Sequence, residues 1–213
     1  MSKLLSTIAT AAFLVAGASA ANAGVIYSWH PFDAAPAAGE TMVMDFDHTI
    51  AAGYSMTWSG AGLYQGPLVS GIAAPPVGDN TKYLSVLTGG IATLTSPGVM
   101  ESMSVYLGSL DEFNSITFKG LNGFNQTFSG GALNSPANGN QIAASTNRRY
   151  YFDFDPNDLI NQVIFSSSGN SFEFDNIAVN DPPAQVPEPL TLSLFAAGLA
   201  GVVSLRRRKA VTA

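Results

Sequence analysis

Short alternating runs of apolar and polar residues fill the middle of this chain, and they constrain its fold more than any other feature. Between residues 24 and 180, Gly, Ser, Asn, Thr and Pro interrupt the chain about every 8 to 12 residues, and no stretch has the periodicity of a long amphipathic helix. Short strands at such spacing are typical of antiparallel sandwiches and barrels. The sequence therefore predicts an all-β domain over residues 24–180, a two-sheet antiparallel β-sandwich of jelly-roll-like form.

The apolar alternation also predicts where the strands lie. Tight hairpins are expected at Thr88-Gly89-Gly90 and at Asn122-Gly123. A single helical turn is expected at 156–160, and residues 60–80 and 130–147 are expected to form loops. The expected strands are 25–29, 41–47, 54–58, 83–87, 91–95, 103–107, 115–119, 123–128, 150–155, 162–166 and 171–179.

Charge and cysteine content exclude several classes of function. All fifteen acidic residues lie between Asp33 and Glu188, where the chain has only four basic residues. So acidic a domain repels nucleic acid and can attract divalent cations. The chain has no cysteine, which excludes disulfides, thiol catalysis and cysteine-bound zinc.

The N-terminus has the pattern of a secretory signal peptide. Lys3 precedes an apolar run from Leu4 to Val15, and small residues follow. Ala21 and Ala23 satisfy the rule for a cleavage site, so residues 1–23 are expected to be removed after export through the Sec translocon.

The C-terminus has a second targeting pattern in three parts. A Pro-rich linker at 181–186 leads to Pro187, Glu188 and Pro189, and the uncharged span 190–205 follows. Sixteen helical residues cover about 24 Å, slightly short of a bilayer core, which suits a temporary transmembrane helix in the inner membrane. The basic residues that stop this span, and that should stay cytoplasmic, are Arg206, Arg207, Arg208 and Lys209.

Residues 187–209 resemble the PEP-CTERM sorting signal of Gram-negative bacteria. The resemblance rests on the Pro-Glu-Pro motif, the apolar span and the basic cluster in combination. It implies that an exosortase-type enzyme recognises Pro187, Glu188 and Pro189 and cuts nearby. It also implies that the protein then reaches the cell surface or an extracellular matrix, as in biofilms.

Three segments of the central domain resemble the jelly-roll-type ectodomain common among PEP-CTERM proteins. They are 106–118, beginning Tyr-Leu-Gly-Ser, then Ala-Asn-Gly-Asn at 137–140, and Phe-Glu-Phe-Asp-Asn-Ile at 172–177. This resemblance implies a two-sheet β fold and no particular activity.

Acidic triplets suggest either a solvated sheet face or an ion site. Asp45-Phe46-Asp47, Asp153-Phe154-Asp155 and Glu173-Phe174-Asp175 each place two carboxylates opposite a Phe. One interpretation is a solvated outer face over a Phe-rich core.

The other interpretation of the triplets is a structural Ca²⁺ site at Asp45, Asp47 and Asp175. The apolar phase of the last strand switches at Asp175-Asn176, which predicts a β-bulge there. Apart from such an ion, no cofactor is expected.

No set of residues in the sequence matches the motif of a known catalytic site. His30 and His48 are isolated, and no Gly-x-Ser-x-Gly, His-Glu-x-x-His or phosphate loop occurs. We therefore expect a non-enzymatic, structural or adhesive surface protein. The first alternative is a carbohydrate-binding module for an exopolysaccharide, with Trp29 and Trp58 as glycan contacts. The second is a secreted hydrolase.

Overall fold

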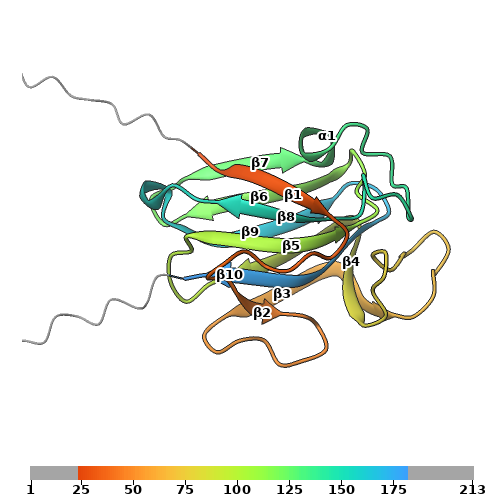
Figure 1. Cartoon of the computed structure of the whole chain (residues 1–213), viewed down its shortest axis with the longest axis horizontal. Coiled ribbons are helices and arrows are strands. Elements are labelled where there is room, and N and C mark those ends of the chain that lie inside the picture. Colours follow the sequence, from red (N-terminus) through yellow and green to blue (C-terminus); the bar gives the residue numbers. More distant parts are fainter. Residues whose placement is uncertain (1–23, 182–213) are drawn as a thin grey trace, which may run out of the picture.

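The computed structural model describes residues 24–181 as ten strands with two short helical turns (Figure 1). The predicted leader 1–23, the linker from 182 onwards and the 187–209 signal lie outside the described residues. The elements are β1 (Ile26–Pro31), β2 (Thr41–Met44), β3 (Ser55–Gln65), β4 (Lys82–Thr95), β5 (Ser102–Gly108), β6 (Asn114–Gly120), β7 (Asn125–Ser129), α1 (Gly130–Leu133), β8 (Arg148–Asp153), η1 (Pro156–Asp158), β9 (Ile160–Ser167) and β10 (Phe172–Asn180).

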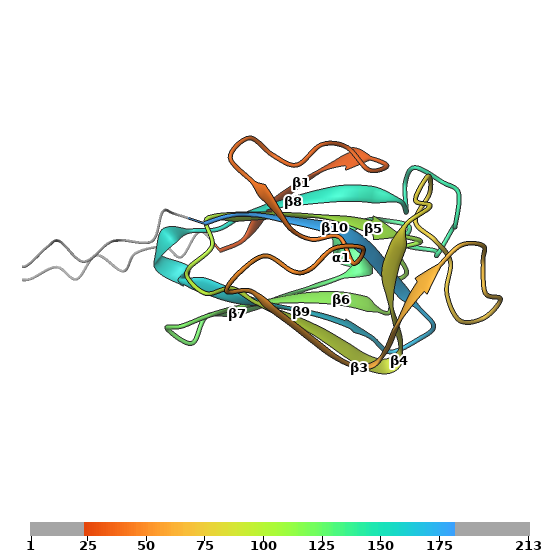
Figure 2. The ribbon, with the colours of Figure 1, turned by 90° about the horizontal axis from the view of Figure 1, so that it is seen from below.

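The strands form two layers, which confirms the predicted antiparallel sandwich (Figure 2). The continuous strand order is β1-β8-β5-β10-β4-β9-β6-β7, and every strand pair is antiparallel. We call the β1-β8-β5-β10-β2 side layer A and the β7-β6-β9 side layer B. Strands β3 and β4 belong to both layers, because β4 pairs with β10 through residues 84–86 and with β9 through residues 91–95.

The predicted hairpin at Thr88-Gly89-Gly90 is wrong, since β4 runs through these residues without reversing. The paired strands β3 and β4 bend here together and carry the sheet from one layer to the other. A Cβ on Gly90 would collide with the carbonyl oxygen of Gly60 on β3, so the bend requires glycine. The loop expected at 60–80 is accordingly shorter, because β3 extends to Gln65.

Other local predictions are confirmed. Strands β6 and β7 form the hairpin expected at Asn122-Gly123, and Gly123 has a φ of 89°. The helical turn expected after Asp155 is η1. In the loop expected at 130–147, residues 130–133 instead form α1, which is N-capped by Ser129.

The core between the layers is rich in aromatic rings. Phe165 of layer B stacks on Phe174 of layer A with ring centroids 4.0 Å apart, and Phe118 meets Phe152 at 4.8 Å. At the side where β1 and β7 leave the sandwich open, Tyr27 packs against Phe128 and donates a hydrogen bond to the Ala132 carbonyl. Alternation along each strand thus places one face inward and leaves the other outward.

The two outward faces have different surroundings. Segments 32–40 and 66–81, which we call the covering segments, contact the outward face of layer A. Segment 32–40 crosses this face, and segment 66–81 reaches it from the end of the sandwich (Figure 1). Gly108 permits this close approach, because a Cβ there would lie 2.8 Å from the Pro76 ring. No covering segment crosses the outward face of layer B within the described residues (Figure 2).

Candidate functional site

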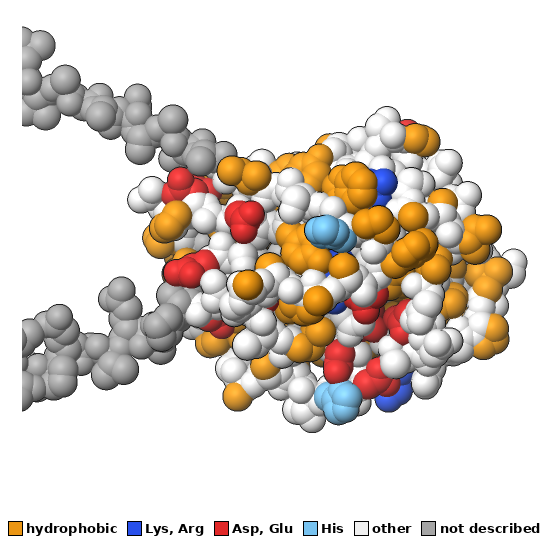
Figure 3. Space-filling model, viewed as in Figure 1, with side chains coloured by type: hydrophobic (Ala, Val, Ile, Leu, Met, Phe, Trp, Pro, Cys, Tyr) orange, Lys and Arg blue, Asp and Glu red, His pale blue; other side chains and the backbone are white. Residues whose placement is uncertain are grey.

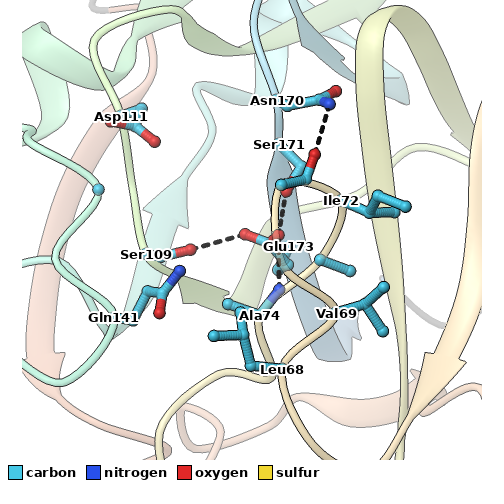
Figure 4. Close-up of a pocket in the computed structure, with 13 residues that line it drawn as sticks. Leu68, Val69, Ile72, Ala74, Ser109, Asp111, Gln141, Asn170, Ser171 and Glu173 are labelled. Atoms are coloured by element: carbon cyan, nitrogen blue, oxygen red, sulfur yellow. Dashed lines mark hydrogen bonds between the residues drawn. The ribbon is translucent and has the colours of Figure 1, made fainter.

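A small cavity opens at the end of the sandwich where covering segment 66–81 meets the start of β10 (Figure 4). Its volume is about 70 Å³, and its wall includes apolar Leu68, Val69 and Ile72. Its polar wall includes Ser109, Asp111 and Glu173. A pocket for a drug-sized ligand holds about 300 Å³ or more. This cavity therefore suits water or one small polar group rather than a sugar ring.

Glu173 lies on the floor of this cavity and is only 1% exposed. Its carboxylate accepts hydrogen bonds from the Ala74 amide at 3.1 Å, from the Ser109 hydroxyl at 2.7 Å and from the Ser171 hydroxyl. Burial raises the pKa of Glu173, and these hydrogen bonds partly offset the rise. Because its acceptor positions are occupied, the geometry makes Glu173 an anchor for segment 66–81.

Asp111 lies on the opposite side of the cavity from Glu173 and has fewer hydrogen-bond partners. Its carboxylate sits against Gly139, where an added Cβ would lie 2.5 Å from both carboxylate oxygens. It accepts no hydrogen bond from the described residues. Burial, together with the negative charges of Glu173 and Glu112, raises the pKa of Asp111 to about 6.

The three segments that carry the ectodomain resemblance meet around this end of layer A. Tyr106 donates a hydrogen bond of 2.6 Å to the Val77 carbonyl of covering segment 66–81, and Glu173 accepts one from the Ala74 amide. Asn138 forms an isolated bridge with Asp111, and Ser109 donates to Glu173. Segments 106–118 and 172–177 thus hold segment 66–81 on layer A, and segment 137–140 pairs with 106–118.

The acidic triplets are only partly as predicted. Phe46, Phe154 and Phe174 are buried in the core. Asp47 and Asp153 are exposed, as the solvated-face interpretation requires. That interpretation is wrong for the third triplet, because segment 66–81 covers its outward side. Glu173 and Asp175 are consequently 1% and 0% exposed.

The predicted β-bulge in β10 is confirmed. The register of β10 against β5 shifts between Asp175 and Ala178, and Asn176 has a φ of 53°. The bulge keeps Phe174 and Ile177 both in the core despite their odd spacing.

The structure gives the three aspartates of the expected calcium site different partners. Strand β2 pairs with β10, so Asp45 does approach the last strand, but its carboxylate binds His48 Nδ1 at 2.6 Å. Asp47 accepts a hydrogen bond from the Lys82 amide at 3.2 Å, and Asp175 accepts one from the Thr81 hydroxyl at 3.3 Å. Among residues 24–181, no three His, Asp or Glu side chains are grouped to hold a metal ion.

Asp45 and His48 shift each other's pKa in opposite directions. Burial would raise the pKa of Asp45, but its hydrogen bonds with His48 hold it below the ordinary value. The same hydrogen bond and the Asp45 charge raise the pKa of His48. Figure 3 shows this acidic region on the layer A side, with acidic side chains gathered beside a histidine. The other histidine, His30, packs edge-on against Tyr151 with ring centroids 5.7 Å apart.

The two tryptophans lie on different strands that are not neighbours in the sheet. Trp29 of β1 is 43% exposed, and the guanidinium of Arg148 lies 3.5 Å from its ring centroid. Trp58 of β3 is 40% exposed, on the inward side of its strand opposite Ala92. The structure does not bring these two rings into one surface, and glycan contact by either remains a prediction.

The outward face of layer B is a grid of hydroxyl groups, which we call the hydroxyl face. One row across five strands reads Thr57, Thr93, Ile164, Thr117, Thr127, and the next reads Ser59, Ile91, Ser166, Ser115, Ser129. Neighbouring hydroxyls pair, with Thr117 2.8 Å from Thr127 and Ser115 2.8 Å from Ser166. A third row reads Ser55, Thr95, Gln162, Lys119, Asn125, so this face has one cation and no carboxylate.

Sequence reasoning missed this face and two further polar residues. The period-two pattern of Ser and Thr in residues 55–59, 93–95 and 115–117 would have indicated the grid. Arg149 was missed because an arginine on a strand normally faces water, whereas here its side chain is 1% exposed. Asp79 was missed because residues 60–80 were assigned to an unordered loop.

Residues 185–209 match the family model for the PEP-CTERM protein-sorting motif. The match includes Pro187, Glu188 and Pro189, the apolar span and the basic cluster, and it confirms the resemblance drawn from the sequence. A motif of this kind indicates an exported protein. In the comparison with curated proteins, no sequence matches this chain. Between Gly24 and Asp181, no helix has the length and apolarity to cross a bilayer.

The comparison with solved structures found carbohydrate-binding modules at low identity and low TM-score. A mutant of the family 29 module CBM29-2 is 13% identical, with a TM-score of 0.40 over 81% of this chain and 97% of that chain. The Clostridium thermocellum xylanase 10B CBM22-1–GH10 structure is 12% identical, with a TM-score of 0.34 over 69% of this chain and 28% of that chain. The family 11 module of C. thermocellum Lic26A-Cel5E is 14% identical, with a TM-score of 0.25 over 69% and 97%. Similarity at these identities concerns the fold alone.

Proposed function

We propose that this chain is a non-enzymatic adhesive protein of the cell surface or extracellular matrix of a Gram-negative bacterium. In this proposal the Sec translocon exports it and the C-terminal span holds it transiently in the inner membrane. An exosortase-type enzyme then cuts near Pro187–Pro189. The sorting-motif match at residues 185–209 supports this route.

The hydroxyl face of layer B is the proposed contact surface, and its lack of carboxylates in an acidic domain is the observation that carries the proposal. Burying a charge against a partner costs desolvation, whereas hydroxyl groups both donate and accept hydrogen bonds. Five strands at about 4.8 Å spacing make each row about 19 Å long. Such a surface complements an uncharged, hydroxyl-rich polymer.

Two isoleucines give the same face an apolar centre. Ile91 is 46% exposed, and Ile164, which is partly buried, lies in the adjacent strand. Their side chains can contact the C–H groups of a sugar ring while Thr93 and Thr117 hydrogen-bond its hydroxyls. This version of the carbohydrate-binding alternative uses a sheet face instead of Trp29 and Trp58.

The hydrolase alternative has weaker geometric support. Glu173 and Asp111 do line one cavity, as paired acids of a glycosidase would. However, the cavity is about 70 Å³ and Glu173 accepts three hydrogen bonds, which favours an anchoring role.

Retention on insoluble polysaccharide tests the proposal. The purified full-length chain should be retained on a neutral glucan more strongly than on anionic alginate. Thr57→Asp with Thr127→Asp adds two carboxylates at exposed positions of the hydroxyl face and should abolish retention. Thr41→Asp, at an exposed strand position of layer A, is the matched control and should be retained as the wild type is. No retention of the wild type on any neutral polymer, or equal retention of all three proteins, would refute it.

A further inference from the structure

Two carboxylates meet beneath covering segment 66–81 without a cation between them. Asp175 lies on the outward side of β10 at the bulge and is 0% exposed. Asp79, in the covering segment, is brought to the same place by Thr81, whose hydroxyl it shares with Asp175. Thr81 touches both acids, since its hydroxyl contacts an oxygen of Asp79 and lies 3.3 Å from an oxygen of Asp175.

The hydrogen bonds available here are too few for two carboxylates. A hydroxyl has a single proton, so Thr81 can donate to only one of the two acids at a time. The second oxygen of Asp175 and the second oxygen of Asp79 are both buried and have no hydrogen-bond partner. The hydroxyl of Tyr83, a residue that is 0% exposed, is likewise buried without a partner. Buried polar atoms in native proteins are nearly always satisfied, so three such atoms indicate a missing ligand.

Tyr83 belongs to the same cluster as the two acids. The register that pairs Leu84 with Phe174 places Tyr83 beside Asp175 on the outward side of layer A. Burial, with the charges of Glu173 and Asp79, raises the pKa of Tyr83 to about 12.

Among residues 24–181, Arg149 is the one fully buried Lys or Arg; its terminal guanidinium nitrogens bind other groups, and its Nε has no hydrogen-bond partner. Arg149 binds Asp33 at 2.8 Å and donates to the Asn176 carbonyl at 2.8 Å and to the Ser104 hydroxyl at 3.0 Å. Nothing in the described part of the chain thus neutralises Asp79 and Asp175.

We propose that Asp79 and Asp175 bind a divalent, oxygen-preferring cation of the calcium type, with the Thr81 and Tyr83 hydroxyls at its border. The donor atoms are all oxygen, which selects hard cations over transition metals. An irregular set of carboxylates and hydroxyls completed by water suits Ca²⁺ better than the strict octahedron that Mg²⁺ requires. The ion would fasten segment 66–81 to β10. The site shares Asp175 with the calcium site expected from the sequence, but its second acid is Asp79 rather than Asp45 or Asp47.

Calorimetry on the full-length chain, stripped with EDTA and dialysed, tests this site. Titration with calcium chloride should show binding of one ion per chain, and magnesium chloride should bind more weakly. Calcium should raise the melting temperature, and EDTA should reverse the rise. Asp79→Asn should weaken calcium binding at least about tenfold. Asp153→Asn, which changes an exposed acid of β8, is the matched control and should bind as the wild type does.

Two outcomes would overturn the proposal. Millimolar calcium that gives neither heat nor a melting shift in the wild type would mean that the two carboxyl groups share a proton instead. Unchanged calcium affinity in Asp79→Asn would place the ion elsewhere. Asp79 lies in a loop and not in a strand, so its substitution leaves the sheet pairing intact and both outcomes remain readable.

Discussion

The two outward faces of the sandwich are built from equivalent strand positions and yet differ in chemistry. The outward face of layer A is covered, and it holds Arg149, Glu173 and Asp175 at no more than 1% exposure. The hydroxyl face of layer B is bare, and among its rows only Lys119 is charged. Charged groups are therefore concentrated where covering segments supply hydrogen-bond partners, and the uncovered face carries groups that water or a neutral polymer can satisfy.

This difference indicates a division of work between the layers. On layer A, the buried Arg149 and Glu173 are structural, because each one holds a covering segment in place. On layer B, polar groups contribute little to the fold and remain available for contacts. Substitutions of similar chemistry on the two faces should therefore have different consequences.

The largest effect is expected from Arg149→Met. The change removes a buried cation and takes one hydrogen-bond donor from Asp33, from Ser104 and from the Asn176 carbonyl. We expect a loss of about 3 kcal/mol in the free energy of unfolding, measured by urea denaturation of the full-length chain. Arg148→Met removes a guanidinium that stacks on exposed Trp29 and should cost about 1 kcal/mol or less. Equal losses in the two variants would contradict the structural role of the covered face.

A smaller but localised effect is expected from Glu173→Ala. The Ala74 amide and the Ser109 hydroxyl lose their acceptor, at a cost of about 2 kcal/mol. Hydrogen exchange should accelerate in residues 66–74, while the amides of β6 and β9 keep their protection. Glu112→Ala, at an exposed position nearby, serves as the control and should leave exchange unchanged. Uniformly faster exchange throughout the sandwich would argue against a local anchor.

Substitution on the hydroxyl face should hardly change stability. Thr117→Val together with Thr127→Val removes both members of a hydroxyl pair, and the β-branched shape is kept. We expect a change within about 0.5 kcal/mol in the free energy of unfolding but weaker retention on neutral glucan. A large loss of stability in this variant would show that layer B polar groups are structural too.

A pH-dependent effect is expected from Asp111. Its pKa in the folded protein is about 6, above its ordinary value of 3.8, so the folded state holds the proton more tightly than the unfolded state does. Stability from this group is thus greatest at low pH and declines as pH rises from about 4 through 6. Urea denaturation across this range should show a shallower decline in Asp111→Asn than in the wild type. An identical slope in both proteins would assign the pH dependence to other groups.

Local sequence patterns predicted the features that depend on neighbouring residues. The Asn122-Gly123 hairpin follows from turn chemistry, and the bulge at Asp175-Asn176 follows from a switch of apolar phase along one strand. Both features can be predicted without knowing how the two layers pack, because each depends only on residues close together in the sequence. The hairpin predicted at Thr88-Gly89-Gly90 is wrong because glycines are equally compatible with a chain reversal and with a bend inside a continuous strand, and β4 has the bend.

The candidate site was less predictable because its parts are distant in the sequence. Asp79 and Asp175 are far apart in the chain, and Glu173 meets Ala74 across 99 residues. No spacing rule connects such pairs. The tertiary contacts that bring segment 66–81 onto layer A include the close approach that Gly108 allows to Pro76 and the hydrogen bond between Tyr106 and Val77.

The amino-acid sequence by itself determined the all-β class, the inward-facing residues and the sorting motif. Each of these depends on residues that are close together along the chain. The tertiary structure alone decided which outward face would be covered and which would stay bare. Alternation distinguishes the two sides of a strand, but only the packing of remote segments determines whether the outward side meets protein or solvent.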